Sequence, residues 1–234
     1  MDIRGGLVGF VGDYDAVDAI CLTGGSLYGL EAVSGVMAEM FARKEWSLLD
    51  IATVSGACIF DYPGRDKVVY PDLQLGRAAL RAAREGAFPL GRRGAGIHAG
   101  VGQGGAFRRE GDVRIAVFTV VNALGAVVDR EGRVRKERIL LAGELAEDTP
   151  VTQHTTLTAV VTDQTLSRRE LVQVGRQVHA SMGRVIQAFH TLNDGDVLFT
   201  LSTRAAAVGT LHSDRLADIA SELAWDAVLC AVEG

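Results

Sequence analysis

The last third of the chain alternates strands with helices. Residues Thr156–Thr162 are rich in Thr and Val and predict a strand. Ser167-Arg168-Arg169-Glu170 follows and has the spacing of a capping box, which predicts the start of a helix. A second strand is expected over Val197–Ser202 and a last helix over about Asp214–Ala231. This alternation restricts the fold to layered α/β architectures in which helices cover a sheet.

The first two thirds of the chain have a less regular pattern. Val17–Leu22 predicts a buried strand that leads into a helix over about Leu27–Arg43, with Ser26 as its N-cap. A turn at Asn122–Gly125 predicts a hairpin, which adds an antiparallel component to the α/β layers. The remaining elements expected here are a buried strand over Leu49–Val54, a helix over about Leu73–Glu85, and the two hairpin strands, Val113–Val121 and Val127-Val128.

Two segments read as connections. Glycine accounts for 28 of the 234 residues, or about 12%, whereas its usual share is about 7%. Seven of the fifteen positions of Gly91–Gly105 are glycine, so this segment is expected to be a loop. Within it, Gly94–Gly100 superficially resembles a dinucleotide-binding fingerprint. Such a fingerprint follows a strand and opens a helix, whereas this segment follows Gly91-Arg92-Arg93. Nucleotide binding is therefore not expected, and the charged segment Arg130–Thr149 is expected to be an exposed connection.

Composition excludes several classes of protein. Apolar residues make up 48% of the chain and the net charge is −5, which is typical of a globular protein and not of a disordered one. There is no basic block for nucleic acid, no apolar run of about 18 residues for a membrane, and no signal-peptide pattern at Met1–Gly6. We therefore expect one domain over residues 1–234 in the cytoplasm.

The cysteines and histidines do not have the spacing of a metal site or of a disulfide framework. The three cysteines are far apart and lie in apolar contexts, which is typical of buried thiols in a reducing compartment. No pair of histidines has the i, i+4 spacing of helical ligands. We expect no metal and no cofactor. The residues concerned are Cys21, Cys58 and Cys230, and His98, His154, His179, His190 and His212.

Two short motifs carry possible chemistry. Asp194-Gly195-Asp196 places two carboxylates close together, and such pairs can orient a catalytic amine or hydroxyl. The alternative is that the Asp and Gly residues only form a turn. Thr155, after His154, opens a strand behind the exposed connection, where backbone cleavage would release an α-amine able to act as a base. The alternative is an ordinary strand start, because Thr favours strands.

Several motifs in the same order resemble the DmpA-type N-terminal-nucleophile hydrolases. This family includes β-aminopeptidases and the nylon-oligomer (6-aminohexanoate) hydrolases, and the chain is most similar to the latter. The likeness covers nearly the whole chain. It rests on Ile20–Ala32, Gln153–Leu157 and His190–Asp196, and the similarity to the nylon-oligomer hydrolases also on Ala106–Arg109, Gly111–Ile115 and Trp225–Leu229.

The resemblance implies a fold and a processing event. The fold is a four-layer αββα sandwich of the DmpA and ornithine-acetyltransferase type, here without the family's first strands before Asp2. The precursor would cut its own backbone at His154–Thr155, giving an α-chain of residues 1–154 and a β-chain of residues 155–234. The products would form a homo-oligomer, a tetramer of α/β units, without a cofactor.

The resemblance also implies site residues. Thr155 takes the position of the nucleophile, Asp194 and Asp196 take the acidic positions, and Asn122 takes that of the oxyanion-stabilising amide. Phe60 and Tyr28 are expected at the substrate. Three features depart from the family: His154 precedes the nucleophile in place of Asn or Gly, Phe60 replaces a Tyr, and the Lys expected just after Gly100 is absent.

Two functions follow. The first is a self-processing N-terminal-threonine hydrolase of linear oligoamides (6-aminohexanoate oligomers), small peptides or amino-acid amides. The second is an uncleaved, catalytically weakened relative that acts as an oligomeric binding or structural protein. Self-cleavage distinguishes them.

Overall fold

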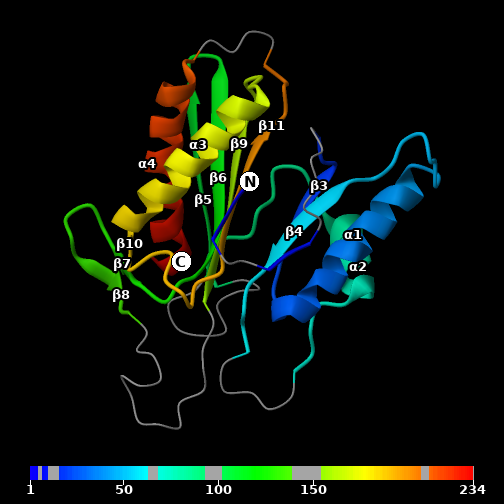
Figure 1. The fold of residues 1–234 in the computed structure, drawn as a ribbon, viewed down its shortest axis with the longest axis horizontal. Helices are drawn as coiled ribbons and strands as arrows, with labels where there is room; N and C mark the ends of the chain where they lie inside the picture. Colours follow the sequence, from blue (N-terminus) through cyan, green and yellow to red (C-terminus); the bar gives the residue numbers. More distant parts are fainter. Residues whose placement is uncertain are drawn as a thin grey trace. The chain divides into compact units, whose positions relative to one another are not determined.

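A computed structural model describes residues 1–4, 7–9, 16–62, 68–92, 102–138, 154–206 and 211–233 (Figure 1). These residues form two compact units, each with a sheet and helices of its own. The larger unit comprises residues 1–5 and 89–234, and the smaller unit comprises residues 6–88.

The larger unit is built on a five-stranded mixed sheet with the order β1-β11-β9-β6-β5. β9 and β11 run parallel to each other, and every other neighbouring pair is antiparallel. β9 lies in the centre and is buried along nearly its whole length, as its Thr- and Val-rich sequence requires. The bounds are β1 Asp2–Arg4, β5 Gly102–Glu110, β6 Val113–Asn122, β9 Thr155–Thr162 and β11 Asp196–Ser202.

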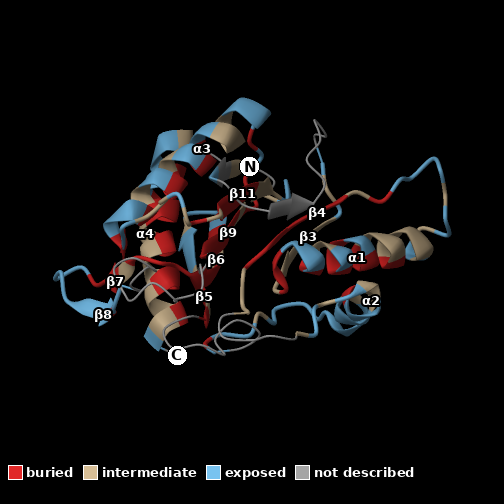
Figure 2. Cartoon of the chain, turned by 60° about the horizontal axis from the view of Figure 1, so that its bottom comes forward, coloured by how far each residue is buried: buried red, intermediate tan, exposed pale blue. Residues whose placement is uncertain are grey.

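Two helices cover one face of this sheet, α3 (Arg168–Ser181) and α4 (Ser213–Glu233) (Figure 1). A one-turn helix, η2 (Met182–Arg184), follows α3. The buried residues of helices and sheet meet between these two layers, where Figure 2 shows most of the red. The core includes Ile115 and Val117 of β6, Val178 of α3, and Ile219 and Leu223 of α4.

The predicted helix start at Ser167 is confirmed. The Glu170 backbone N–H donates to the Ser167 hydroxyl at 3.3 Å, and the Ser167 backbone N–H donates to the Glu170 carboxylate at 2.8 Å. Both bonds satisfy backbone donors that have no partner within the helix. The two strands and the last helix predicted for the last third of the chain are confirmed within one or two residues at each end. The helix after Ser167 ends at Ser181, and Ile186 belongs to a short strand instead.

The prediction of a loop over Gly91–Gly105 is wrong for its last part, because β5 begins at Gly102. The glycines allow α4 to lie directly against this strand. A β-carbon on Gly104 would lie 1.8 Å from the carbonyl oxygen of Ala227, and one on Gly102 would lie 2.3 Å from that of Ala231. Glycine is therefore required here by close packing and not by a turn. The fingerprint-like part of the segment lies outside the described residues.

The predicted hairpin is also wrong. β6 pairs with β5 and β9, whereas β7 (Ala126–Val128) belongs to a separate three-stranded sheet, between β10 (Ile186–Gln187) and β8 (Val134–Lys136). The chain leaves the large sheet after Asn122, so the turn joins two sheets. β8 also corrects the prediction that Arg130–Thr149 is only an exposed connection, because Lys136 is buried. Residues 139–153 lie outside the described ranges.

The smaller unit has a three-stranded sheet with the order β2-β4-β3. The helix α1 packs on β3 and β4, and α2 packs on α1. The bounds are β2 Leu7–Gly9, β3 Ala19–Thr23, β4 Val54–Cys58, the 3₁₀ helix η1 Ser26–Gly29, α1 Leu30–Arg43 and α2 Leu73–Ala82.

Two predictions in this unit need correction. Ser26 does not cap an α-helix, because it begins η1 with a positive φ of 52°, and α1 starts only at Leu30. The strand predicted over Leu49–Val54 begins instead at Val54, since Val54–Cys58 is the buried stretch between β2 and β3 and Leu49 is fully exposed.

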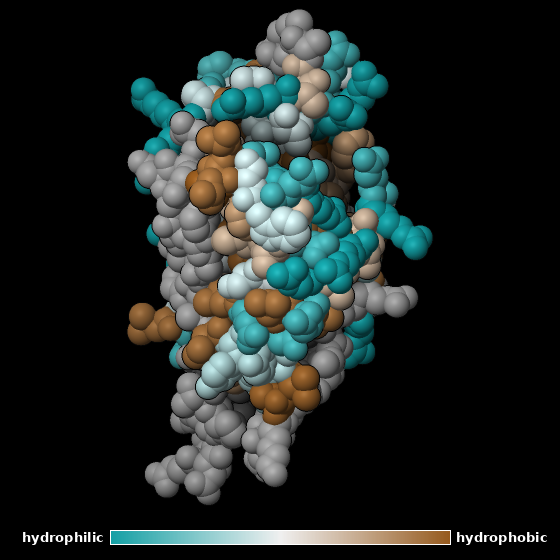
Figure 3. Space-filling view, turned by 90° about the vertical axis from the view of Figure 1, so that its right-hand side faces the viewer, coloured by the Kyte–Doolittle hydropathy of each residue, from teal (hydrophilic) through white to brown (hydrophobic). Residues whose placement is uncertain are grey.

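On the face drawn in Figure 3, exposed apolar side chains form small separate patches among hydrophilic ones, as is usual for a folded protein surface.

Both units combine a sheet with helices, which confirms an α/β fold class. The four-layer sandwich and the single hydrolase domain over residues 1–234 stay predictions. Of the helices described, none combines the length and the apolar character that crossing a bilayer demands.

Candidate active site

Three strand ends of the large sheet bring four predicted catalytic residues together. β6 ends at Asn122, whose register partner is Thr155, the first residue of β9. β11 starts at Asp196 and runs parallel to β9, and Asp194 forms a bridge with His154 just before it. Directly paired residues of an antiparallel ladder project from the same face. The Asn122 and Thr155 side chains therefore share a face of the sheet.

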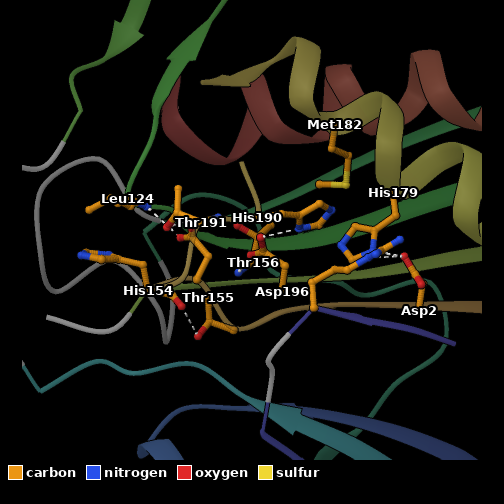
Figure 4. Close-up of polar contacts among 12 residues, drawn as sticks. Asp2, Leu124, His154, Thr155, Thr156, His179, Met182, His190, Thr191 and Asp196 are labelled. Atoms are coloured by element: carbon orange, nitrogen blue, oxygen red, sulfur yellow. Dashed lines mark hydrogen bonds and ion pairs between the residues drawn. The ribbon is translucent and has the colours of Figure 1, made fainter. Parts of the chain in front are cut away.

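The Thr155 hydroxyl is buried and contacts the peptide group that precedes it (Figure 4). It donates to the carbonyl oxygen of His154 at 2.7 Å. The backbone N–H of Gly195 donates to the same oxygen, also at 2.7 Å, and the His154 N–H donates to the Asn193 carbonyl at 2.9 Å. The carbonyl at the predicted cleavage site is thus polarised by two donors and held in place on both sides.

Asp196 is completely buried and uses both carboxylate oxygens. One oxygen accepts the backbone N–H of Thr156 at 2.7 Å, and the other lies 2.9 Å from Nδ1 of His190. Burial raises the pKa of Asp196, and the nearby charge of Asp194 adds to this. The hydrogen bonds from His190 and Thr156 act in the opposite direction.

Asp194 serves both the site and the turn that precedes β11. One oxygen accepts the Leu124 N–H at 3.4 Å, just beyond Asn122. The other accepts the backbone N–H of Thr191 at 3.0 Å and the Thr191 hydroxyl at 2.7 Å. The interpretation that Asp194 stabilises a turn is therefore confirmed, and the same side chain also lies at the candidate site.

Lys136 is a site neighbour that sequence reasoning missed. Its ammonium donates to the carbonyl oxygens of Ala123, Gly125 and Glu137 at 2.9, 3.1 and 3.1 Å. Burial lowers its pKa to about 8, against the attraction of Asp194, which raises it. The lysine ties the segment after Asn122 to β8. Its burial follows from the β7–β8 pairing, for which the charged sequence carries no signal.

His154 is buried within this group of charges. Burial lowers its pKa, and the positive charge of Lys136 acts in the same direction. The charge of Asp194 and a hydrogen bond with the backbone of Asn122 oppose the shift. His154, which precedes the predicted nucleophile, is therefore a neutral imidazole at pH 7.

The two residues expected at the substrate belong to the smaller unit. Tyr28 is exposed, with its ring 5.7 Å from that of Tyr70. The Phe60 ring packs edge-on against Tyr62 at 6.0 Å. Their role in substrate binding stays a prediction, and the position of the absent family Lys lies outside the described residues.

The larger unit thus combines a buried hydroxyl, an amide side chain, backbone donors and two carboxylates. These groups suit acyl transfer, in which a hydroxyl attacks a carbonyl carbon and N–H donors stabilise the oxyanion. In the part of the chain that the structure describes, no three His, Cys, Asp or Glu side chains are grouped to hold a metal ion. The three cysteines are free thiols.

Comparison with known proteins gives one consistent family. Residues 9–233 match Peptidase family S58. The 6-aminohexanoate-oligomer endohydrolase of Kocuria sp. (strain KY2) is 42% identical over all of this chain and 76% of its own length. The 6-aminohexanoate-oligomer endohydrolase of Paenarthrobacter ureafaciens is 43% identical over 98% of this chain and 75% of its own length.

A solved structure supports the fold. The β-aminopeptidase of Burkholderia sp. superposes with a TM-score of 0.58 over 91% of this chain, at 17% sequence identity. This chain spans 65% of that protein, just under two thirds. The resemblance to DmpA-type hydrolases is confirmed, and the chain belongs to Peptidase family S58.

Proposed function

We propose that this protein is a self-processing amide hydrolase that cuts its own His154–Thr155 bond and then uses Thr155 as its nucleophile. The observation that carries the proposal is the 2.7 Å hydrogen bond from the Thr155 hydroxyl to the His154 carbonyl oxygen, inside a buried polar site. The hydroxyl therefore lies beside the carbonyl group whose carbon it would attack, and such proximity lowers the entropic cost of an acyl transfer.

Self-cleavage would proceed in two steps. The Thr155 Oγ attacks the carbonyl carbon of His154 and loses its proton, and the Gly195 N–H stabilises the negative oxygen. The C–N bond then breaks, the Thr155 nitrogen takes a proton, and residue 154 is left as an ester on Oγ. Water hydrolyses the ester, which frees the His154 carboxylate and the Thr155 hydroxyl and α-amine.

Turnover of a substrate would use the same groups. The free α-amine of Thr155 takes the proton from Oγ as Oγ attacks an amide carbonyl. The Asn122 side chain, paired with Thr155 across the ladder, donates to the oxyanion. The carboxylates of Asp194 and Asp196 stabilise the positive charge of the protonated amine. The amine leaving group departs with a proton, and water then hydrolyses the ester on Thr155.

The names of the relatives suggest the substrate class. Both relatives reported above, each over 40% identical, are 6-aminohexanoate-oligomer endohydrolases, and the superposed structure is a β-aminopeptidase. We therefore propose linear oligoamides, small peptides or amino-acid amides as substrates. We also propose a homo-oligomer of α/β units, without a metal or cofactor.

The second candidate is an uncleaved relative that binds without turnover. The observation in its favour is the loss of two family side chains, since Phe60 carries no hydroxyl and no Lys follows Gly100. The intact Thr155, Asn122 and acidic pair favour the hydrolase instead. Lys136, whose pKa the charge of Asp194 raises, also provides a cation near the acidic pair.

The mass of the purified protein under denaturing conditions tests the proposal. Two fragments, of residues 1–154 and 155–234, are expected, and release of amine from a 6-aminohexanoate oligomer should follow. A chain that stays whole after prolonged incubation contradicts self-processing and supports the second candidate.

A further inference from the structure

The Asp196 carboxylate is held by a histidine for which the proposed mechanism has no role. We propose that His190 is a positioning residue that keeps Asp196 ionised and aimed at the nucleophile. The inference rests on the proposed function, since it assigns the support of the same acidic group.

Asp196 is buried and depends on hydrogen bonds from the protein. Its side chain has no exposure to solvent, so donors from the protein must replace water around any charge on it. The Thr156 N–H occupies one oxygen at 2.7 Å, and His190 Nδ1 occupies the other at 2.9 Å. Thr156 directly follows the nucleophile, so the two bonds fix the carboxylate beside Thr155.

The backbone of His190 has an unusual conformation. Its φ is +59°, in the left-handed region that residues with a β-carbon rarely adopt. Such conformations persist where the surroundings impose them, and they gather at functional sites. The ring is further confined by Phe189, with centroids 3.9 Å apart, and by the edge of His179 at 4.4 Å.

Among the titratable groups that the structure describes around this pair, His190 hydrogen-bonds to Asp196 and the others do not. Asp194, in the same turn, opposes ionisation of Asp196. On the α3 side, Nδ1 of His179 lies 2.9 Å from Asp2 of β1, which also pairs with Arg4. Burial lowers the pKa of His179 to about 4, so this ring is neutral at pH 7. Figure 4 shows the two pairs side by side, with His190 directed at Asp196 and His179 at Asp2.

The consequence concerns the proton on the nucleophile's amine. An ionised Asp196 stabilises the ammonium group that forms when the Thr155 amine takes the hydroxyl proton. Without the donor on its second oxygen, burial favours the neutral acid, which cannot do this. Loss of His190 should therefore move the acid limb of the pH–rate profile to higher pH.

The test compares one substitution that keeps a donor at this position with one that removes it. In His190→Asn, the side-chain amide nitrogen takes the place of Nδ1, and Asn tolerates the left-handed backbone. In His190→Leu, the ring volume is largely kept but the donor is lost. His179→Leu is the control, because it removes a buried neighbouring ring that does not bond to Asp196.

Carbon-13 NMR of proteins labelled at the Asp carboxyl carbon gives the direct readout. All variants are made in a Thr155→Ala background so that every chain is whole, and the Asp196 signal is assigned with Asp196→Asn. We expect Asp196 to titrate at least tenfold more weakly as an acid in His190→Leu, and as in the parent in His190→Asn and His179→Leu. Equal titration in His190→Leu and the parent overturns the proposal.

A second measurement needs no substitution at position 190. The ring nitrogen-15 shifts of His190 should show a proton on Nδ1 at pH 7, and an unprotonated Nδ1 overturns the proposal even if the Leu variant does not fold. Neither NMR experiment requires catalysis. A wild-type chain that is neither cleaved nor active would therefore contradict the proposed function, while the role of His190 is decided separately.

Discussion

Asn122 and Thr155 are direct register partners, at the last position of β6 and the first position of β9. Their side chains share a face because register partners in a ladder always do. A shift of one residue in the pairing would move Asn122 to the opposite face of the sheet. The relation between the proposed nucleophile and its oxyanion donor is thus set by the central ladder of the sheet.

Substitutions at Thr155 and Thr156 should show which of the two threonines is the nucleophile. Thr155→Ala should abolish both self-cleavage and hydrolysis, because no hydroxyl remains to attack His154. Thr155→Ser should keep cleavage, and so should Thr156→Ala, since the Asp196 contact uses the backbone N–H of residue 156. Denaturing mass spectrometry checks each variant. Fragments from Thr155→Ala would eliminate this residue as the nucleophile.

Asn122→Ala should lower kcat by a factor on the order of 10²–10³, the usual effect of removing one oxyanion donor. KM should change little, because the contact strengthens only as the oxyanion forms. Asn122→Asp is the matched control for shape, and it should be as slow as the Ala variant since it has no amide N–H. Steady-state kinetics on an oligoamide would decide, and an active Asp variant would contradict the role.

Asp194→Asn should cut turnover steeply and leave the fold in place. The Asn oxygen can still accept from Thr191 and preserve the turn, while the charge at the site is lost. Asp194→Ala removes both functions, so its melting temperature should fall further. Kinetics and thermal unfolding monitored by circular dichroism separate the two effects. If the Asn variant retains full activity, the carboxylate serves only the turn.

Lys136 should impose a pH dependence on stability. Its pKa of about 8 in the folded chain lies below the ordinary value of 10.5, so between these values the unfolded chain holds a proton that the folded chain has lost. The contribution of Lys136 to the free energy of unfolding should therefore rise with pH in this range, by at most about 1.4 kcal/mol per pH unit. Cys21 and Cys58, whose pKa values burial raises, contribute a slope of the opposite sign above about pH 9.

Lys136→Met should remove this contribution, which makes the slope against pH less positive than in the parent. It should also lower stability at pH 7 by about 1–3 kcal/mol, because carbonyl groups lose their donor. Urea unfolding at several pH values between 7.5 and 10 measures both effects. Arg135→Met, on the exposed side of the same strand, is the control and should keep the slope. Equal slopes in Lys136→Met and in the parent would assign the pH dependence to other groups.

The sequence predicted the part of the fold that local rules decide. The capping box at Ser167 and the strand before it depend on neighbouring residues alone, and both are confirmed. The glycines of β5 were misassigned because their cause is the distant α4 backbone, packed against Gly102 and Gly104. Composition cannot distinguish a glycine that turns the chain from one that admits a helix.

The site shows the same division. Thr155, Asn122, Asp194 and Asp196 were identified through motif resemblance, and the strand register brings them to one end of the sheet. Lys136 and the contact of His190 with Asp196 were not predicted. The burial of Lys136 depends on the pairing of β7 with β8, and the contact of His190 depends on one left-handed backbone angle. Neither leaves a periodic signal in the sequence.

The strand order has a consequence for the products of the proposed cut. β9 and β11 would go with residues 155–234, while β1, β6 and β5 would stay with residues 1–154. The smaller fragment would then occupy the middle of the sheet, with a strand of the larger fragment hydrogen-bonded along each side of it. The two pieces would be interleaved and would migrate as a single particle in gel filtration. Only a denaturant that opens both ladders would separate them, so a native preparation would conceal its own processing.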